Sequence, residues 1–378
     1  MRPRFFEIHL LIGGLLLGST GFLASRSRSQ TREAVGSSSF AGIPSAMVRT
    51  APLLNFPHDT DSNSPVHWDG ETIYLLNSAP NPWISSGPDL FHLGAATETH
   101  YDKEMNGGRW IEATWKAENG ILYGWYHNEP HPVCPSNPGL TAPRIGGARS
   151  KDNGAHWEDL GLIMQAPPYP LRCDTLDRFF TGGNGDFSVI PDNQREYFYF
   201  FFSTYHPNAS EQGVSVARLK YSDRDNPVGK VSKWYKGEWS EPGFGGHVTP
   251  VFPVRIPWHR KDVDAFWGPS IHWNSHLHMY VILLNRAIDR DWTQEGIYVS
   301  FNRSLDHPQG WTKPTKLLDR TALTDNPTRK MAWYPQVIGT STAKRETDKV
   351  AGKAARLFVQ GQSRWEVLFL NPGEQSKE

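Results

Sequence analysis

Apolar residues along the chain gather in short runs that come in pairs, each pair joined by a polar turn. In residues 63 to 78, NSPVHWDGETIYLLNS, a short apolar run, a turn and a second apolar run follow one another, and residues 268 to 285 repeat this order. Runs of this length bounded by turn residues are typical of β-strands rather than of helices. The pattern therefore predicts consecutive antiparallel strand pairs.

The same strand pair recurs three more times, at residues 110 to 129, 182 to 205 and 333 to 362. The spacing of the five copies is typical of propeller blades that carry loop insertions. In residues 197 to 202, YFYFFF, both faces of the strand are apolar, which suits a sheet covered on both sides. We therefore predict an all-β fold, a five-bladed β-propeller with about four antiparallel strands per blade. A β-sandwich is the structural alternative, but it would not produce this repeat.

The two ends of the chain differ from the repeats. Residues 1 to 24 place two arginines before a short apolar segment that ends in a small residue, as in a secretory signal peptide; an uncleaved anchor is the alternative. Residues 25 to 50 are rich in Ser, Arg and Ala, which predicts a flexible lead. The propeller is expected over residues 51 to 372 and a tail over residues 373 to 378. The mature protein is thus expected to be secreted or periplasmic, without membrane contact after cleavage.

The charge of the chain is balanced, with 39 basic and 39 acidic residues among 378. This balance gives no indication of a nucleic-acid partner or an anionic membrane surface. A neutral polar partner fits better, and a monomer is expected. The two cysteines, Cys134 and Cys173, lie in proline-rich loop sequence and can form at most one disulfide, and the sequence leaves open whether they do.

The central channel of the predicted propeller is where chemistry is expected. The innermost strand of each blade lines this channel, so residues at the strand starts meet at one mouth. Aligning the five copies places at one level Asn63, Trp110, Asp186, Gly268 and Tyr334, and two residues deeper Pro65, Glu112, Ser188, Ser270 and Gln336. Glu112 and Asp186 are the only acids of these two rings, and Asp59 and Asp61 precede the first copy directly.

Three sources of carboxylate converging on one well suit the hydrolysis of a glycosidic bond. Crowding and burial raise the pKa of one acid so that it can donate a proton, while another stays ionised. We assign Asp186 as the acid, Asp61 as the base or nucleophile and Glu112 as the residue that tunes the pair. The alternative is that such acids cap turns or pair with arginines. The nearby arginines that could form such pairs are Arg109, Arg144 and Arg286.

Tryptophans and polar residues near the strand starts predict the sugar contacts. Indole rings stack on the apolar faces of sugars, and polar side chains bind the hydroxyl groups. The predicted substrate-binding residues are Asn63, Trp68, Trp110, His127, Glu129, Trp267, Arg286 and Trp333. No cofactor or metal site is predicted, because His127, Glu129 and His131 alternate in a proline-rich loop rather than in a helical metal motif. A structural cation on the propeller axis is compatible with the pattern.

Two sequence motifs resemble known propellers. SKDNGAHW, residues 150 to 157, resembles the Asp-box of sialidases, which implies a structural turn on the outer rim and a scaffold role for Asp152. More broadly, SPVHWDGETIYLLNS, FWGPSIHWNSHLHMYVILLNRA and GIYVSFNRSLDHPQGWTKP resemble strand pairs and hairpins of the five-bladed β-propeller glycoside hydrolases, which include arabinanases, β-xylosidases, arabinofuranosidases and the levanase and invertase type. This resemblance covers most of residues 55 to 370.

The family resemblance implies an aspartate base or nucleophile from the first blade, a tuning carboxylate from the second and a glutamate acid from the third. By position, these roles fall to Asp61 or Asp59, then Glu112, then Asp186. The chain departs from the family in three ways: Asn63 stands at the level of the first-blade aspartate, blade three offers aspartate for glutamate, and WMNDPNG is missing.

We therefore predict an exported glycoside hydrolase that acts on a neutral oligo- or polysaccharide. Two alternatives stay open. The first is a carbohydrate-binding propeller that has lost catalysis, as the departure at Asn63 would allow. The second is a sialidase-like or lyase propeller, in which Arg109, Arg144 and Arg286 converge on a substrate carboxylate.

Overall fold

A computed structural model describes residues 42–168, 171–324 and 332–374 of the chain. The predicted signal peptide and residues 25 to 41 of the predicted lead lie outside the described residues. The described part is almost entirely β-strand, with one short helix, α1 (Arg320–Thr324). Three single 3₁₀ turns complete it: η1 (Ala209–Glu211), η2 (Tyr221–Asp223) and η3 (Pro308–Gly310).

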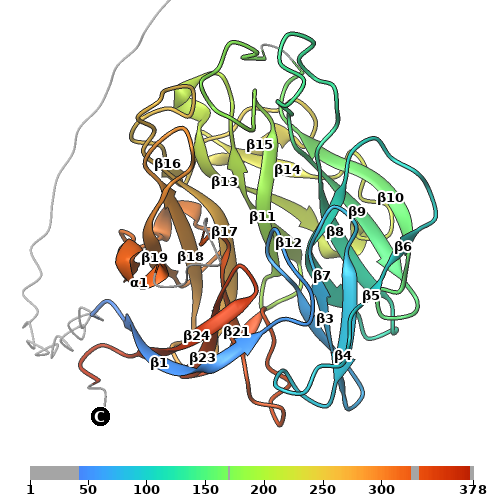
Figure 1. The fold of residues 1–378 in the computed structure, drawn as a ribbon, viewed down its shortest axis with the longest axis vertical. Helices are drawn as coiled ribbons and strands as arrows, with labels where there is room; N and C mark the ends of the chain where they lie inside the picture. The colour runs from blue at the N-terminus through green and yellow to red at the C-terminus, as the bar shows by residue number, and fades with distance from the viewer. Residues whose placement is uncertain (1–41, 169–170, 325–331, 375–378) are drawn as a thin grey trace, which may run out of the picture. The chain divides into compact units, whose positions relative to one another are not determined.

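The strands form five small sheets, which are the blades of the propeller (Figure 1). Blade I contains β2 (Val66–Asp69), β3 (Thr72–Asn77), β4 (Trp83–Gly87) and β5 (Thr97–Glu98). Blade II contains β7 (Arg109–Lys116), β8 (Leu122–Asn128), β9 (Arg144–Ser150), β10 (His156–Gln165) and the short β6 (His100–Tyr101). Blade III contains β11 (Asn184–Pro191), β12 (Tyr197–Thr204), β13 (Gly213–Lys220), β14 (Ser232–Tyr235), β15 (Glu238–Pro242) and β16 (Phe252–Pro253).

The remaining strands form two further blades. Blade IV contains β17 (Ala265–Asn274), β18 (Met279–Ala287), β19 (Gln294–Asn302), β20 (Thr315–Asp319) and the short β22 (Val350–Ala351). Blade V contains β21 (Pro335–Gly339), β23 (Ala354–Val359), β24 (Gln362–Leu370) and β1 (Ser45–Asn55). The five-bladed, all-β propeller predicted from the repeats is therefore confirmed.

The inner strands β2, β7, β11, β17 and β21 follow one another around the axis. The ring closes between blades V and I, where the side-chain oxygen of Gln336 accepts a hydrogen bond from the Ser64 amide at 2.9 Å. The side-chain amide of Gln336 donates in return to the Ser64 carbonyl. A side chain of the last blade thus pairs with the backbone of the first blade as another strand would.

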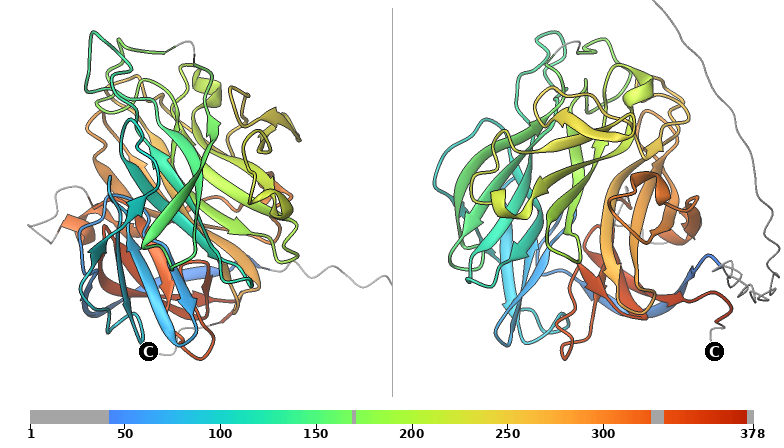
Figure 2. Two further views of the ribbon diagram at one scale, coloured as in Figure 1. Left: turned by 90° about the vertical axis from the view of Figure 1, so that its right-hand side faces the viewer. Right: turned by 180° about the vertical axis from the view of Figure 1, so that it is seen from behind.

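Blade V is built from both ends of the described chain. β1 pairs antiparallel with β24, from Ser45 opposite Leu370 to Asn55 opposite Gln362 (Figures 1 and 2). The predicted flexible lead is therefore wrong for residues 45 to 50, which are part of this strand. The sequence did not indicate a strand there because no residue of β1 is fully buried, and Ala46 and Val48 pack only partly against the core.

The core lies in separate layers between neighbouring blades. In β12, Phe198, Phe200 and Phe202 pack toward blade II, while Tyr199 and Phe201 pack toward blade IV. All five side chains are buried, as expected for a strand with two covered faces. Burying one such ring contributes roughly 1.5 to 3 kcal/mol. The aromatic strand therefore holds three blades together.

Two loop features bear on the sequence analysis. Cys134 and Cys173 form a disulfide with their Cα atoms 5.6 Å apart, which settles the question that the sequence left open. In the turn between β9 and β10, the Asp152 carboxylate accepts hydrogen bonds from the Ser150 hydroxyl at 2.8 Å and the His156 amide at 2.9 Å. Asp152 thus stabilises a turn. Within the described residues, none of the helices has the length and apolar character needed to cross a lipid bilayer.

Candidate active site

Glu112 and Asp186 lie side by side because both occupy β-bulges. The register between β7 and β8 shifts between Ile111 and Ala113, and that between β11 and β12 shifts between Gly185 and Phe187. The extra residue in each bulge is the acid, and a bulge redirects the side chain that it carries. The sequence alignment placed Glu112 two residues deeper than Asp186. The bulges instead bring the two acids to equivalent positions on neighbouring blades.

His127, at the end of β8, connects the two acids. The Phe187 amide donates to Glu112 Oε2 at 2.5 Å, and His127 Nδ1 lies 3.3 Å from Glu112 Oε1. The Asp186 amide donates to the same Nδ1 at 3.0 Å. Each of the three side chains is buried. We call Glu112, His127 and Asp186 the buried triad.

The protonation of His127 depends on the two glutamates that face its ring. His127 Nε2 lies 3.1 Å from Glu129 Oε1, so the proton on this nitrogen is directed at Glu129. Burial raises the pKa of Glu112. Burial opposes the charge of His127, but the hydrogen bonds and charges of Glu112 and Glu129 outweigh it and raise the pKa of His127.

Asp186 is the acid whose environment favours the protonated form most clearly. Burial, with Glu112 as a further cause, raises the pKa of Asp186 to about 7, against the lowering effects of His127 and the hydrogen bond from Tyr205. The Tyr205 hydroxyl donates to Asp186 Oδ2, and the Tyr334 hydroxyl donates to Oδ1 at 3.2 Å. Asp186 can therefore hold or release a proton near neutral pH.

Asp61 is the predicted acid that remains accessible. It precedes β2 and is exposed. Desolvation by its surroundings, followed by the charge of Glu129, raises the pKa of Asp61 to about 6, while His127 and a hydrogen bond from Trp110 lower it. Asp61 thus lies close enough to the buried triad to share its electrostatics. Asp59, the other acid of this segment, is also exposed.

The backbone at the start of three inner strands is strained. Asp186, Gly268 and Tyr334 have φ angles of 42°, 53° and 57°, and the sequence alignment had placed these three residues at one level. A positive φ is costly for a residue with a bulky side chain, and such strain clusters at functional sites. The strain at Tyr334 is therefore notable, because its hydroxyl is what contacts Asp186.

Asn63 connects neighbouring blades and does not lie open at the mouth of the channel. It is buried, and its amide nitrogen donates to the carbonyl oxygens of Phe187 at 3.0 Å and Pro269 at 2.9 Å. One side chain of the first blade therefore ties down the third and fourth blades. This placement does not fit the predicted sugar contact, because both amide protons are already used inside the protein.

The predicted tryptophans divide into three groups. Trp110 lies at the mouth, with its ring 5.6 Å from that of His127. Trp267 and Trp333 are buried in an aromatic cluster around Trp292, so their faces are not open to a sugar. Trp68 lies at the far end of β2, where its indole nitrogen donates to the Glu346 carbonyl at 3.0 Å. Only Trp110 of the four stands beside the acids.

The three arginines considered for a carboxylate-binding cluster each contact a different partner. Arg286 forms a two-pronged ion pair with Asp264, with both contacts at 2.8 Å. Arg109 lies over the Tyr101 ring at 3.6 Å. Arg144 donates to the Asn128 side-chain oxygen at 2.8 Å. Arg109 and Arg144 flank Asn128 in blade II, whereas Arg286, one of the predicted sugar contacts, is paired with Asp264.

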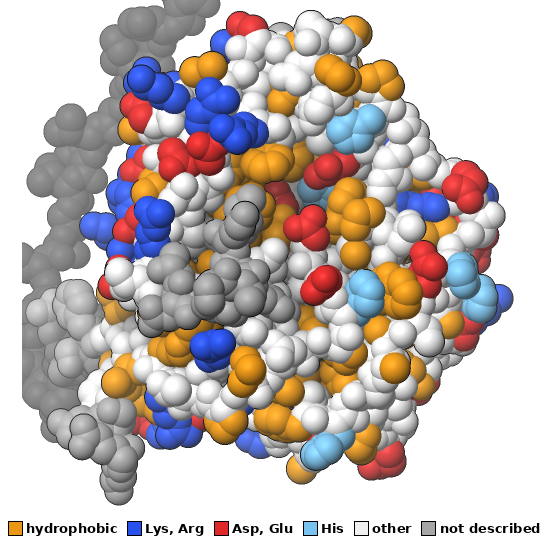
Figure 3. All heavy atoms as spheres, in the orientation of Figure 1, with side chains coloured by type: hydrophobic (Ala, Val, Ile, Leu, Met, Phe, Trp, Pro, Cys, Tyr) orange, Lys and Arg blue, Asp and Glu red, His pale blue; other side chains and the backbone are white. Residues whose placement is uncertain are grey.

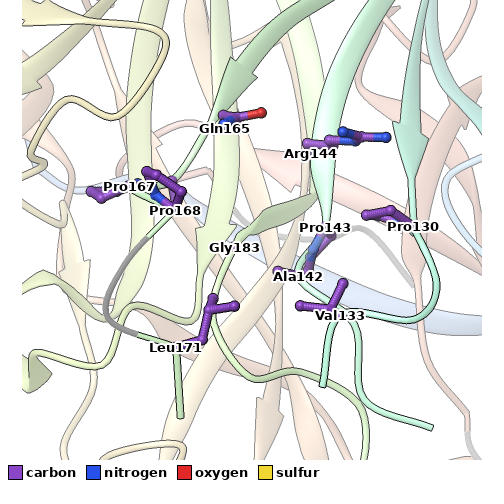
Figure 4. A pocket seen from close by; sticks show the side chains of 11 residues that line it. Pro130, Val133, Ala142, Pro143, Arg144, Gln165, Pro167, Pro168, Leu171 and Gly183 are labelled. Atoms are coloured by element: carbon purple, nitrogen blue, oxygen red, sulfur yellow. The ribbon is translucent and has the colours of Figure 1, made fainter. Parts of the chain in front are cut away.

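A pocket of about 260 Å³ lies beside the buried triad, between the loops after β8 and β10. Figure 4 shows Pro167 and Pro168 on one side of it and Pro130 on the other. Pro143 also lines the pocket, and a Cβ added to Gly185 would lie 2.8 Å from Pro143 and 2.5 Å from the His127 ring. The pocket wall is therefore in close reach of the triad. Figure 3 shows acidic side chains near the middle of one face of the molecule, with hydrophobic ones among them.

The buried triad is also the one set of residues in the described chain with ligand atoms placed for a metal ion, all within 4.8 Å of one another. Each of these atoms already has a partner, however. Asp186 accepts from two tyrosines, Glu112 faces an amide and His127, and His127 faces an amide and Glu129. A triad closed by its own hydrogen bonds does not fit a resident metal ion.

No protein-family model and no curated protein matches the chain. Among solved structures, it is similar to an exo-β-1,3-galactanase from Phanerochaete chrysosporium, with 12% identity, a TM-score of 0.47 and coverage of 86% of this chain and 63% of that chain. An endo-arabinase from Bacteroides thetaiotaomicron has 11% identity, a TM-score of 0.47 and coverage of 86% and 98%. An arabinanase from Bacillus subtilis has 13% identity, a TM-score of 0.44 and coverage of 84% and 96%. The chain thus spans less than two thirds of the galactanase. These similarities are distant.

Sequence reasoning missed two residues of the site, Tyr205 and Tyr334. Tyr334 stood at the right level of the alignment but was not assigned a role, since a tyrosine in an aromatic-rich chain has many other uses. Tyr205 follows β12 directly, and no sequence pattern separates it from the packing aromatics before it. Positive φ at Tyr334, the signal that distinguishes it, is visible only in the structure.

Proposed function

We propose that this protein is an exported glycoside hydrolase that cleaves a glycosidic bond of a neutral oligo- or polysaccharide. The observation that carries the proposal is the difference in environment between two acids: Asp186 is buried and held by the hydroxyls of Tyr205 and Tyr334, whereas Asp61 is exposed. The pKa of buried Asp186 is raised to about 7, and that of exposed Asp61 to about 6. Burial favours the protonated form of Asp186 more strongly, while the exposed Asp61 is the acid more readily ionised. This division is what acid and base catalysis of glycoside hydrolysis uses.

In the proposed reaction, Asp186 gives its proton to the oxygen of the leaving sugar as the bond from that oxygen to the anomeric carbon breaks. Asp61 takes a proton from water, whose oxygen bonds to the anomeric carbon, or it attacks that carbon itself. Glu112 tunes Asp186, because its negative charge contributes to the raised pKa. The pocket beside Pro143 gives room for the part of the sugar chain that is not cleaved.

The experiment is turnover of a panel of aryl pentosides, hexosides and sialosides by the wild type, Asp61→Asn and Asp186→Asn. We expect the wild type to turn over a pentoside or hexoside. Either variant should lose at least about 10²-fold in kcat, which is the lower end of the effect of removing a general acid or base. Asp59→Asn is the matched control, since Asp59 is an exposed acid two residues before Asp61, and it should keep its activity. Equal activity of Asp61→Asn and the wild type would overturn the assignment.

A second candidate function is a carbohydrate-binding propeller without catalysis. The favouring observation is that both carboxylate oxygens of Asp186 accept hydrogen bonds from tyrosines, while Asn63 stands at the first-blade position. The same panel separates the two functions. A binding module would bind sugars with no turnover of any substrate, and Asp186→Asn would not alter its products because there would be none.

Export is part of the proposal and has its own support. The bond between Cys134 and Cys173 is of the kind that persists in oxidising compartments. The test is expression of the full chain, followed by N-terminal sequencing of the protein outside the cytoplasm. We expect a mature N-terminus near residue 25. A full-length protein retained in the cytoplasm would contradict this part of the proposal.

A further inference from the structure

A second pocket lies at the opposite ends of the inner strands from the buried triad. It has a volume of about 200 Å³ and is bordered by the ends of β7, β11 and β17 and by residues 349 and 350, which precede β23 in the chain. Five residues separate Asp186 from Pro191, which borders this pocket, so the two sites lie roughly 16 Å apart along the strand. A ligand here would not share the acids of the mouth. We call this the distal pocket.

Two tryptophans from different blades, Trp115 of blade II and Trp273 of blade IV, line the distal pocket. Both are partly exposed, unlike the buried Trp267 at the other end of β17. Ile190 and Pro191, from the blade between them, supply further apolar surface. The Arg195 guanidinium lies over the Trp115 ring, 5.7 Å from its centroid, so Trp273 is the indole better placed to stack on the C–H face of a sugar ring.

Both indoles are held in place by contacts away from the pocket. The Trp115 indole nitrogen donates to the Tyr221 hydroxyl at 3.0 Å. The Trp273 ring meets the Tyr280 ring edge-on at 4.9 Å, and its backbone amide donates to the Lys349 carbonyl at 2.9 Å. Rigid aromatic side chains lose little conformational entropy when a ligand binds, so the tryptophans are prepared for one.

The charged groups around the distal pocket already have partners within the protein. Arg195 pairs with Glu118, and Lys349 pairs with Asp348 at 2.5 Å. The Asp192 carboxylate accepts from the backbone amides of residues 196 and 197, at 2.8 and 3.1 Å. Both cations are thus paired, and the Asp192 carboxylate is occupied by backbone amides, so an uncharged ligand fits better than a charged one.

Two hydrogen-bonding groups remain available. In the described part of the chain, the side-chain amide of exposed Asn193 and the indole N–H of Trp273 have no hydrogen-bond partner. An amide both donates and accepts, which suits hydroxyl groups. The volume is below the roughly 300 to 1,000 Å³ of pockets for drug-sized ligands, so it has room for one ring rather than a chain.

We propose that the distal pocket binds one uncharged sugar residue of an oligosaccharide, against the indole of Trp273, with Trp115 and Asn193 as further contacts. This inference does not depend on catalysis at the mouth. It gives the propeller two carbohydrate sites at opposite ends of its inner strands. A polysaccharide could then be held at one end while another of its chains is bound at the other.

The test is isothermal titration of the full chain with xylohexaose and cellohexaose, in an Asp61→Asn background so that hydrolysis does not interfere. We expect Trp273→Ala to remove one binding event, or to weaken it at least tenfold, for one or both sugars. Asn193→Ala, on an exposed turn, should weaken the same event several-fold without lowering the Tm. Trp239→Ala is the matched control, because Trp239 is a partly exposed tryptophan on the outer strand β15.

Unchanged binding in both Trp273→Ala and Asn193→Ala would overturn the proposal, as would the absence of binding by either sugar. A decrease of the same size in Trp239→Ala would also overturn it, because the effect would then not be local. A failure of the proposed function would give a different experimental result. In that case the panel of aryl glycosides shows no turnover, while the event that depends on Trp273 is still present.

Discussion

Tyr334 of blade V and Asp186 of blade III meet at the centre of the propeller, where the tyrosine hydroxyl donates to Asp186 Oδ1 at 3.2 Å. Both residues have positive φ angles, 57° and 42°. Tyr205 donates to the other oxygen of the same carboxyl group. The acid with a pKa near neutrality is therefore held by two tyrosines, and the strained backbone is part of what places it there.

Replacing Tyr205 with Phe removes a hydrogen bond that stabilises ionised Asp186, so the pKa of Asp186 rises above about 7. If Asp186 is the general acid, activity is lost as the pH rises through this pKa. We therefore expect the basic limb of the pH profile of kcat/KM to move up by roughly one pH unit. Tyr199→Phe is the control, because the Tyr199 hydroxyl contacts Asp306 instead. An unmoved basic limb in Tyr205→Phe would show that another group is the acid.

Replacing Asn63 with Asp places a carboxylate against the carbonyl oxygens of Phe187 and Pro269, which both need a donor. We expect a loss of roughly 2 to 4 kcal/mol in the free energy of unfolding at pH 7, and no gain in activity. Asn63→Ser, which loses the donors without adding charge, should lose less. The measurement is urea denaturation at pH 7 and pH 4, since a protonated carboxyl group at this position could donate once. A stable and more active Asn63→Asp variant would contradict the structural role.

His272 makes the protein sensitive to acid. It is buried with Nε2 unpaired, and burial lowers the pKa of His272 to about 3. Below about pH 6.5 the unfolded chain binds a proton here, and the folded chain does not until about pH 3. The unfolding free energy therefore falls as the pH decreases through this range, by up to about 1.4 kcal/mol per pH unit.

The variant His272→Phe should be less sensitive to acid than the wild type. The free energy of unfolding of both proteins is measured with denaturant at pH 7, 5 and 4. Near pH 7 the two should differ only by a constant cost of repacking against Phe369, and the pH-dependent difference should appear at pH 5 and 4. His100→Leu, an exposed substitution, should keep the slope of the wild type. Equal slopes for His272→Phe and the wild type would mean that this imidazole is protonated in the folded state.

The disulfide should stabilise the protein substantially. The two cysteines are 39 residues apart, and a loop of this length corresponds to about 4 kcal/mol in the chain-entropy model. We expect the double variant Cys134→Ser/Cys173→Ser to lose a stability of this order in denaturant unfolding. The wild type in excess reductant should match it. Full stability of the double variant would show that the loops after β8 and β10 are held by their other contacts.

The blades could be predicted from the sequence because the same strand pair occurs five times. One short apolar run can belong to a strand or to a buried helix, but five copies of the same pair favour strands. β1 could not be predicted in the same way, because it is the outer strand of a blade whose other strands lie about 280 residues later. Nothing near Ser45 indicates that its partner is Leu370. A pairing between the two ends leaves no local pattern.

The site was only partly predictable, for a geometric reason. The alignment assumed regular strands, in which each residue adds about 3.3 Å and reverses direction. The bulges at Glu112 and Asp186 break this rule, and so two acids assigned to different levels are neighbours. Trp68 illustrates the opposite error. It lies two residues beyond the start of a four-residue strand, which is enough to carry it to the other end of the blade.

The pairing of β1 with β24 also sets the order in which the protein can be completed. During synthesis, the segment from Ser45 to Asn55 leaves the ribosome early and must wait, with one edge bare, until the segment from Gln362 to Leu370 emerges. Any chain released before that point lacks β24, so β1 and β23 are left with unpaired borders. Such borders attract strands of other chains. Completion of blade V therefore depends on β24, the last strand of the described chain.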